Sequence, residues 1–458
     1  MVLAPEEKLK TELVRNAFSS LKHLSKSEPN LAIFFINNLS RADLISLIDE
    51  ADIIVDAMLG SGIRGALREP YRTTVETINT VVKGQNKKVV AIDVPTGWKG
   101  SVSIEPDLVV TFHDIKKGYQ ELAEKTEIAD IGIPVEAEVF INKGHLLLLP
   151  ELKKDTHKGM RGAVLVIGGG PFSGAPVLSA LGASQSGIDL IHLAVPHKIF
   201  GAVISFSPDF IVHPLRKPEH IFSLSHLPDV LPTLKNMDAL VLGPGLGRAQ
   251  DTLQAVMKLL ETEKGKGQWE FSKSIPCLLD ADALFAIAEN LPKFLKLRNK
   301  SKNLLLEPLV LTPHEGEFKR LLKRIKVSEE DIRSAYSGKE FNILGLSTEL
   351  KEKIVETKLV ARKIQAVILR KGPVDIITDG YKTRLNFSGT PAMAVGGTGD
   401  VLSGICGGLL AQGLAPLEAS ALGAYINGKA GELAFESKGR SMKATDVAAF
   451  IYKALKNV

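Results

Sequence analysis

Short apolar runs separated by amphipathic or polar segments recur along the whole chain. The first of them occupy residues 31–38, 53–60, 88–96, 108–113 and 128–133. Runs of this length are typical of buried strands, and the intervening segments suit connecting helices. Because strands that alternate with helices form parallel sheets, the pattern predicts a doubly wound α/β fold for this part of the chain.

A polar stretch at 150–162 interrupts the pattern, and a longer series of apolar runs follows it. These runs occupy residues 163–168, 188–195, 238–243, 276–280, 308–312 and 366–378. Small-residue helical segments lie between them, and most of the chain from residue 399 onward is helical in pattern. We therefore expect two domains, 1–147 and 148–458, of which the second is a large α/β/α domain.

The composition narrows the class of partner. The 458-residue chain carries 57 Lys and Arg against 52 Asp and Glu, a net charge of +5. This mild excess suits anionic small molecules and does not indicate nucleic acid or a membrane as a partner. No uninterrupted apolar run approaches the roughly 18–20 residues of a membrane span. Cys277 and Cys406 are far apart and form no CxxC pair, which favours a cytoplasmic protein without a zinc site or disulfides.

The strongest chemical signal is a glycine cluster that leads straight into a helix, GGTGDVLSGICGGLLAQG at 396–413. Backbone N–H groups at such a helix start, together with the helix dipole, bind anions such as phosphate. Asp400 lies at the mouth of this anion site, where an acid would repel phosphate unless it serves as the base for a hydroxyl that is being phosphorylated. The alternative is an ordinary N-cap. The clustered glycines favour the functional interpretation.

Two further motifs follow predicted strands. One is VLGPGLG at 241–247, which places glycines where open α/β sheets bind ligands, although it also fits a tight strand–helix connection. The other is LDADAL at 279–284, which brings Asp280 and Asp282 to the same side of an extended chain. This pair could hold Mg²⁺ through water, contact a substrate hydroxyl, or cap a helix.

Two more motifs end later strands, LTPHEGEF at 311–318 and RKGPVDIITDG at 370–380. His314 could bind a polar substrate group and Glu317 a metal-bound water, although a lone histidine is more often structural. Lys371 ends one strand of a hairpin, where it could pair with a nucleotide phosphate or simply occupy a surface turn.

Taken together, these motifs resemble the ADP/ATP-dependent NAD(P)H-hydrate dehydratase family. The resemblance covers about 157–435 and rests on the order and spacing of HKGMRGAVLVIGGGPFSGAP, VLGPGLG, LDADAL, LTPHEGEF, KGPVD and GGTGDVLSG. It implies a ribokinase-like α/β/α fold. It also implies a reaction in which a phosphoryl donor, ADP in prokaryotes or ATP in eukaryotes, drives removal of water from C6 of a (6S)-NAD(P)H hydrate, with Mg²⁺ as cofactor.

The resemblance also implies roles for individual residues. Nucleotide contacts are implied for Lys371, Gly372, Pro373, Val374, Asp375 and Gly399. Substrate contacts are implied for Ala175, Gly245 or Gly247, His314 and Asp400, with Asp400 as the catalytic base. The family usually has Lys-Gly-Ala-x-Thr where this chain has Lys-Gly-Pro-Val-Asp, so Asp375 cannot make a threonine hydroxyl contact.

The first domain resembles the NAD(P)H-hydrate epimerase domain, which is often fused upstream of the dehydratase. The matching segments are VDAMLGSGIRGALREPY, AIDVPTGWKG, DLVVTFHDIKKG and IADIGIP. The resemblance makes Asp93 the catalytic acid/base and Asp56 and Thr96 the ligands of K⁺. Substrate contacts are implied for Gly60, Ser61, Gly62, Ile63, Arg64, Gly65 and Ala66. We expect this domain to be incomplete, because only Asn37 and Asn38 match the family's early Asn-Asn-Gly-Gly-Asp-Gly segment.

The sequence therefore predicts a homo-oligomeric, ADP-dependent (S)-NAD(P)H-hydrate dehydratase. Its partial, Rossmann-like first domain would interconvert the R and S hydrates if it is active. Two alternatives stay open. The GGTGD segment alone also fits a small-molecule kinase, although VLGPGLG and LTPHEGEF favour the dehydratase. The first domain could be a non-catalytic interaction module, because a fold does not fix an activity.

Overall fold

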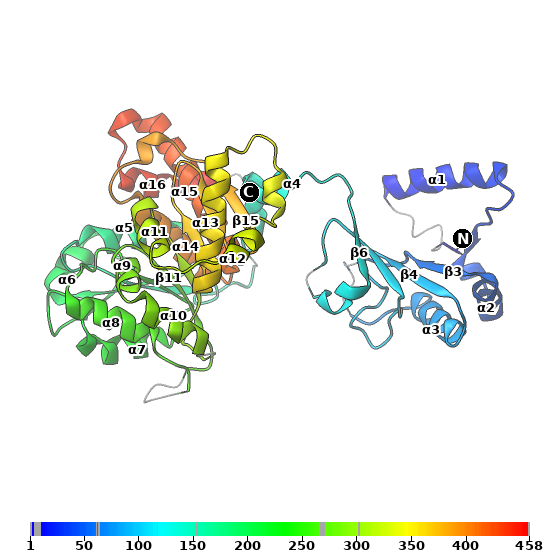
Figure 1. Cartoon of the computed structure of the whole chain (residues 1–458), viewed down its shortest axis with the longest axis horizontal. Helices are drawn as coiled ribbons and strands as arrows, with labels where there is room; N and C mark the ends of the chain where they lie inside the picture. The colour runs from blue at the N-terminus through cyan, green and yellow to red at the C-terminus, as the bar shows by residue number, and fades with distance from the viewer. Residues whose placement is uncertain are drawn as a thin grey trace. The chain divides into compact units, whose positions relative to one another are not determined.

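The computed structural model divides the chain into two compact units, Met1–Ile133 and Pro134–Val458 (Figure 1). It describes residues 2–3, 11–60, 62, 65–116, 118–152, 154–265, 271–300 and 303–456. Both units are α/β, as the alternation of apolar runs predicts. None of the described helices is long and apolar enough to cross a membrane.

The boundary between the units lies closer to the N-terminus than the predicted boundary at 147/148. Residues 134–147 begin with the short helix α4 (Val135–Val139) and belong to the second unit. A backbone hydrogen bond links this segment to the second unit: Ile141 N–H donates to the Leu385 carbonyl at 2.9 Å. Ile141 and Leu146 are buried in the second unit's core. Burial of these apolar side chains, which precede the polar stretch, explains the earlier boundary.

The first unit contains a four-stranded parallel sheet in the order β3-β4-β5-β6. The strands are β3 (Ile53–Asp56), β4 (Lys88–Ile92), β5 (Leu108–Phe112) and β6 (Thr126–Ala129). They agree with four of the five predicted strands. Helices α2 (Arg41–Glu50) and α3 (Tyr71–Val82) pack on one face through a small apolar cluster. Ile53, Val55 and Phe112 are exposed.

The predicted strand at 31–38 is wrong in most of its length. Only β2 (Phe34–Phe35) is extended there, and it pairs with β1 (Val2–Leu3) instead of joining the four-stranded sheet. Ile36–Asn38 form a 3-10 turn, because asparagines favour turns over ladders. Helix α1 (Glu12–Ser27), which precedes this segment, has no buried residue.

The second unit contains a nine-stranded sheet in the order β15-β14-β13-β12-β11-β10-β7-β8-β9. Its strands are β7 (Ala163–Ile167), β8 (Leu190–Pro196), β9 (Phe210–Leu215), β10 (Ala239–Leu242), β11 (Ile275–Leu279), β12 (Leu306–Leu311), β13 (Val367–Arg370), β14 (Asp375–Thr378) and β15 (Thr383–Asn386). Strand β14 is antiparallel to both of its neighbours, β13 and β15, and all other neighbouring strands pair in parallel. The sequence pattern missed β9, which contains His213 and Pro214, and β15, which alternates with polar residues.

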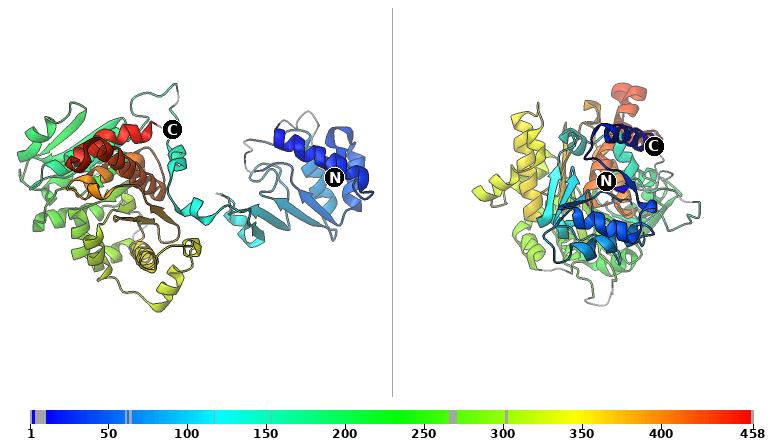
Figure 2. Two further views of the ribbon diagram at one scale, coloured as in Figure 1. Left: turned by 90° about the horizontal axis from the view of Figure 1, so that it is seen from above. Right: turned by 90° about the vertical axis from the view of Figure 1, so that its right-hand side faces the viewer.

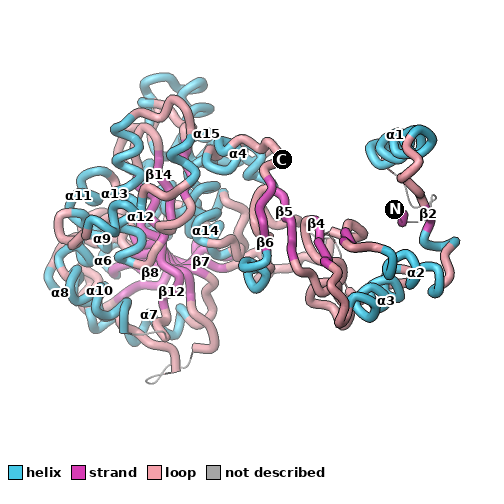
Figure 3. Tube along the Cα trace, turned by 45° about the vertical axis from the view of Figure 1, so that its right-hand side comes forward, coloured by secondary structure: helices cyan, strands magenta, loops and turns pink. Residues whose placement is uncertain are grey.

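Helices cover both faces of this sheet (Figures 2 and 3). One face packs against α5 (Gly174–Gln185), α14 (Thr398–Ala411), α15 (Pro416–Lys438) and α16 (Ala444–Leu455). The other packs against α7 (Leu227–Leu234), α8 (Gln250–Leu260), α9 (Asp282–Glu289), α10 (Leu291–Lys300), α11 (Glu315–Leu322) and α13 (Thr348–Ile364). Helices α6 (His197–Ile204) and α12 (Glu329–Ala335) complete the α-helices described for this unit. The predicted α/β/α sandwich is confirmed.

The strand order fixes where a ligand can enter. Strand β7 lies between β8 and β10. The strands that follow β7 first add on one side of it, as β8 and β9, and then on its other side, starting with β10. In open α/β sheets the loops diverge at such a switch point and leave a crevice beyond the carboxyl ends of the strands. The loops after β7, β10, β11, β12 and β13 all lie at this edge, because these strands are parallel.

Candidate functional site

The glycine turn after β10 packs directly on the loop after β7. At Gly245 a Cβ atom would lie 2.5 Å from the Phe172 carbonyl oxygen and 3.0 Å from the Cβ of Ala175. At Gly247 it would lie 2.7 Å from Pro171. Both glycines have positive φ, 68° and 80°. Only glycine allows so close an approach, so three predicted substrate-contact positions, Ala175, Gly245 and Gly247, lie together.

Asp282 fixes this turn. Its carboxylate accepts a hydrogen bond from Gly247 N–H at 2.7 Å and pairs with Arg248 Nε at 3.1 Å. Asp280 makes different contacts: it is buried and pairs with Lys371. The two carboxylates therefore contact different protein groups, although the negative charges of both raise the pKa of the Asp400 carboxyl. The residue between them, Ala281, has a φ of 48°, and α9 begins directly after it, so the chain is not extended there.

Lys371 connects the strand ends to the glycine-rich helix. Its Nζ lies 3.0 Å from Asp280 Oδ1, and a Cβ added at Gly399 would lie 3.3 Å from the same Nζ. Burial disfavours its charge, but the carboxylates of Asp280 and Glu317 outweigh burial and raise the pKa of Lys371. The ammonium is therefore a fixed positive charge beside the first turn of α14.

Asp400 lies in that first turn. The N-cap of α14 is Gly397, with a φ of 99°, so Asp400 is not the N-cap. The Ser179 and Ser403 hydroxyls donate to its carbonyl oxygen at 2.9 and 2.8 Å and tie the turn to α5. Burial, followed by the negative charge of Asp280, raises the pKa of the Asp400 carboxyl to about 7. A carboxyl with that pKa can accept or return a proton near neutral pH.

His314 is the N-cap of α11. Its Nδ1 accepts a hydrogen bond from Gly316 N–H at 3.0 Å, and the Glu317 carboxylate accepts one from the His314 N–H at 3.0 Å. This reciprocal arrangement is a capping box. The His314 side chain is 59% exposed, and its Nε2 lies 3.5 Å from Glu317 Oε1. Burial raises the pKa of the Glu317 carboxyl.

The turn after Lys371 is closed by Asp375. Its carboxylate accepts hydrogen bonds from Gly372 N–H and from Asn386 Nδ2, each at 3.0 Å. Burial raises the pKa of Asp375. Gly372 and Pro373 are exposed at the tip, with Val374 half-buried beside them. The residue that replaces the family's threonine therefore holds the shape of the turn.

The described residues form no ready-made metal cage. They contain no group of three or more His, Cys, Asp or Glu side chains that could hold a metal ion. Asp280, one of the carboxylates considered for Mg²⁺, pairs with Lys371 instead.

In the first unit, Asp56 and Thr96 contact each other at the ends of β3 and β4. Thr96 donates to the Asp56 carboxylate from its hydroxyl and its N–H, each at 2.7 Å, and Met58 N–H donates at 3.2 Å. Both side chains are buried. The two predicted K⁺ ligands are thus adjacent, and their oxygens form a hydrogen-bonded tie between the strand ends.

Asp93 follows β4 with a φ of 67°. Its Oδ1 pairs with Lys116 Nζ at 2.8 Å, a contact that the sequence analysis missed because Lys116 lies in a different loop. Gly60 approaches the same carboxylate: a Cβ there would lie 3.8 Å from Oδ2. A nearby cavity of ≈ 290 Å³ is lined by Gly60, Gly65, Ala66, Leu67, Val94, Pro95, Gly97, Trp98, Lys99, Gly100, Ser101 and Tyr119.

The predicted substrate loop 60–66 is therefore described in part. Gly60, Gly65 and Ala66 line the cavity, whereas Gly62 is exposed and not among its lining residues. Ser61, Ile63 and Arg64 lie outside the described residues.

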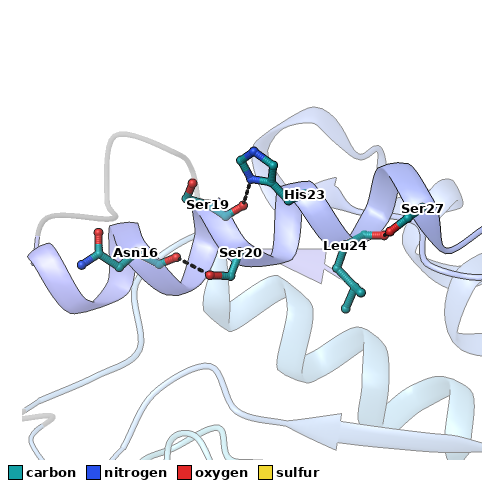
Figure 4. A pocket seen from close by; sticks show the side chains of 6 residues that line it. All are labelled: Asn16, Ser19, Ser20, His23, Leu24 and Ser27. Atoms are coloured by element: carbon teal, nitrogen blue, oxygen red, sulfur yellow. Dashed lines mark hydrogen bonds between the residues drawn. The ribbon is translucent and has the colours of Figure 1, made fainter.

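A wider hollow of ≈ 700 Å³ runs along α1 (Figure 4) and does not qualify as a site. It is lined by Asn16, Ser19, Ser20, His23, Leu24 and Ser27, all from one helix. Ser20 donates to the Asn16 carbonyl and His23 Nδ1 contacts the Ser19 carbonyl, so these polar groups serve their own helix.

Comparison with known proteins agrees with this geometry. A family profile described as NAD(P)H-hydrate dehydratase matches residues 164–453, and one described as YjeF-related protein N-terminus matches 1–118. Among solved structures, a ribokinase-like superfamily protein from Enterococcus faecalis V583 has a TM-score of 0.53 at 21% identity, over 71% of this chain and 98% of that one. The protein SMU.573 from Streptococcus mutans also has a TM-score of 0.53, at 20% identity, over 70% of this chain and 99% of that one. These two structures confirm the ribokinase-like fold of the second unit.

Closer relatives match most of both units. The bifunctional NAD(P)H-hydrate repair enzyme Nnr of Hyperthermus butylicus is 36% identical over 429 residues, which cover 89% of this chain and 71% of that protein. The enzyme of the same description from Methanocaldococcus jannaschii is 31% identical over 460 residues, 100% of this chain and 80% of that protein. On this similarity, the chain belongs to the family of bifunctional NAD(P)H-hydrate repair enzymes.

Proposed function

We propose that the second unit is an ADP- or ATP-dependent (S)-NAD(P)H-hydrate dehydratase. The observation that carries this proposal is the meeting of three features: the glycine-capped first turn of α14, the Lys371 ammonium beside Gly399, and the Asp400 carboxyl with a pKa of about 7. Amide donors and a lysine suit a transferable phosphate, and a carboxyl with this pKa suits proton transfer from a hydroxyl.

In the proposed reaction Asp400 accepts the proton of the hydrate hydroxyl while that oxygen attacks the terminal phosphoryl group, whose bridging P–O bond breaks so that the nucleotide leaves with one phosphate fewer. The C6–O bond then breaks with phosphate as the leaving group, and loss of a proton from C5 restores the C5=C6 double bond of the dihydronicotinamide ring. The α14 amides and Lys371 stabilise the negative charge during transfer. Mg²⁺ would be held mainly by the nucleotide's own phosphates and would neutralise part of their charge.

The surrounding loops supply the two binding sites. We assign the nucleotide to Lys371, Gly399 and the turn Gly372–Asp375, where Asp375 acts through the shape of the turn. We assign the hydrated ring to the packed pair of loops that contains Ala175, Gly245 and Gly247, with His314 at the next strand end. The juxtaposition of these loops at the switch point supports both assignments.

The test is a repair assay on the purified chain. Hydrated NADH mixed with ADP, or with ATP, should regain the absorbance of NADH, and Asp400→Asn should abolish that recovery. Stabilisation by a sugar or a pyrimidine without any recovery from the hydrate would instead support a small-molecule kinase. Recovery that is unaffected by Asp400→Asn would disprove the assigned role.

We further propose that the first unit interconverts the R and S hydrates, with Asp93 as the acid/base. Its support is the Asp93–Lys116 pair beside a cavity lined by Gly60 and Gly65. K⁺ would be held by oxygens of Asp56 and Thr96. Asp93→Ala should remove the chain's ability to interconvert the pure epimers. Unchanged interconversion would mean that the unit contributes none, as expected of an interaction module.

A further inference from the structure

The Lys371 side chain crosses the carboxyl end of a neighbouring strand to reach its partner. Lys371 follows β13, whereas its partner Asp280 follows β11, and β12 lies between these strands. Two strand spacings amount to about 9.6 Å, so the lysine side chain must extend across the end of β12 to reach the carboxylate. The 3.0 Å contact therefore fixes the direction of a long side chain that has many other rotamers available.

Without Asp280, the position of the Lys371 ammonium would be unfavourable for a positive charge. Nζ lies close to Gly399 at the start of α14, where the helix dipole repels cations. The Lys371 side chain is only 20% exposed, and a largely buried charge requires a partner. Asp280 is 2% exposed, and its carboxylate lies at hydrogen-bond distance from the ammonium. The pairing thus compensates for both penalties.

We propose that Asp280 is a positioning residue that holds the Lys371 ammonium at the first turn of α14, ready for the nucleotide phosphate and away from the Asp400 carboxylate. This inference rests on the proposed dehydratase function and goes beyond it. Without Asp280, the lysine is free to turn toward Glu317 or Asp400, the other carboxylates that interact with it. A lysine that paired with Asp400 would hold that group ionised, and it would no longer be placed for phosphate.

The charges that face Asp400 come from four elements. They are Asp280 after β11, Lys371 after β13, Asp282 at the start of α9, and Glu317 in α11. Removal of the Asp280 charge therefore lowers the pKa of Asp400 in two ways: a like charge is lost, and Lys371 is released. The acid limb of the dehydratase pH–rate profile, which requires ionised Asp400, should move to lower pH.

The test compares Asp280→Asn with the intact chain in two measurements. Simple electrostatics predicts that ADP binds more tightly when the site loses a negative charge. Positioning predicts the opposite, a Kd for ADP raised about tenfold, because a charge-assisted contact to phosphate is lost. The acid limb of kcat should shift down by about one pH unit. ADP binding that is unchanged or tighter, or an acid limb that does not move, would overturn the proposal.

Two further variants complete the design. Asp280→Glu keeps the charge but moves it by one methylene, so it should weaken ADP binding and leave the acid limb in place. If Asp280→Asn does not fold, this variant decides alone: wild-type ADP affinity would overturn the positioning role. The matched control is Asp238→Asn. Asp238 lies just before the amino end of β10, on the side of the sheet away from the site, and its carboxylate pairs with Lys273 at 2.7 Å. This control should change neither quantity. An intact chain that repairs no hydrate would disprove the proposed function, which is a separate result.

Discussion

Replacement of Asp400 by asparagine should make the protein more stable above neutral pH while it abolishes hydrate repair. The substitution keeps the shape of the side chain and removes its charge. Burial and the nearby Asp280 and Asp282 carboxylates raise the pKa of Asp400 from 3.8 to about 7. The wild-type protein therefore carries a strained negative charge at pH 8, and the variant does not.

The size of the effect follows from the pKa shift. In the unfolded chain Asp400 loses its proton near pH 4, whereas the folded protein retains it up to about pH 7. Its contribution is therefore fully present below pH 4 and is lost as the pH rises through 7. A shift of about three units at roughly 1.4 kcal/mol each gives about 4 kcal/mol at pH 8 as an upper bound. The two proteins should be equally stable near pH 4.

Urea unfolding followed by hydrogen exchange at β10 and β11 measures the second unit separately from the first. The free-energy advantage of Asp400→Asn should grow by about 3 kcal/mol between pH 5 and pH 8. As a control, Asp155→Asn changes an exposed aspartate and should show no such growth. A variant that is less stable than wild type at pH 8, or whose advantage does not depend on pH, would refute the argument that Asp400 is held at an electrostatic disadvantage.

Three other outcomes follow from the same geometry. The rate of repair should rise with pH through about 7 as Asp400 ionises in the free enzyme, and a flat profile from pH 5 to pH 8 would exclude it as the base. Gly404→Ala should lower the free energy of unfolding by about 3 kcal/mol, because the new Cβ would lie 1.9 Å from the Ser179 carbonyl oxygen. Gly201→Ala, which has open space around it, should instead raise the free energy of unfolding by up to about 1 kcal/mol. Equal effects of the two variants in urea unfolding would contradict the packing. Lys116→Met should slow epimer interconversion while dehydration of the pure S hydrate stays unchanged, and parallel losses of both activities would show that Lys116 is only structural.

Periodicity and strand-end motifs predicted much of the larger unit, because its parallel strands are buried on both faces and form continuous apolar runs. Strands β9 and β15 escaped this reasoning. His213 and Pro214 interrupt the first, and β15 reads Thr-Arg-Leu-Asn. Both lie at the edges of the sheet, where tertiary pairing decides the structure more than local pattern does.

In the candidate site, too, some features could be predicted from the sequence and others could not. The sequence predicted which loops come together, because parallel strands end at one edge of a sheet. It did not predict which carboxylate pairs with which partner. Asp280 and Asp282 are two positions apart, yet one contacts Lys371, 91 residues away in sequence, and the other contacts Gly247. Such pairings depend on strand order and on the turn at Ala281, which no local pattern reveals.

The central claim is that the transferable phosphate binds at the opening turn of α14, between the Lys371 ammonium and the Asp400 carboxyl. A crystal structure of the chain soaked with ADP and Mg²⁺ tests it most directly. We expect the terminal phosphate to accept hydrogen bonds from backbone amides of 397–400, with Nζ of Lys371 on one of its oxygens. A nucleotide whose terminal phosphate lies elsewhere, with Lys371 still paired only to Asp280, would contradict the claim.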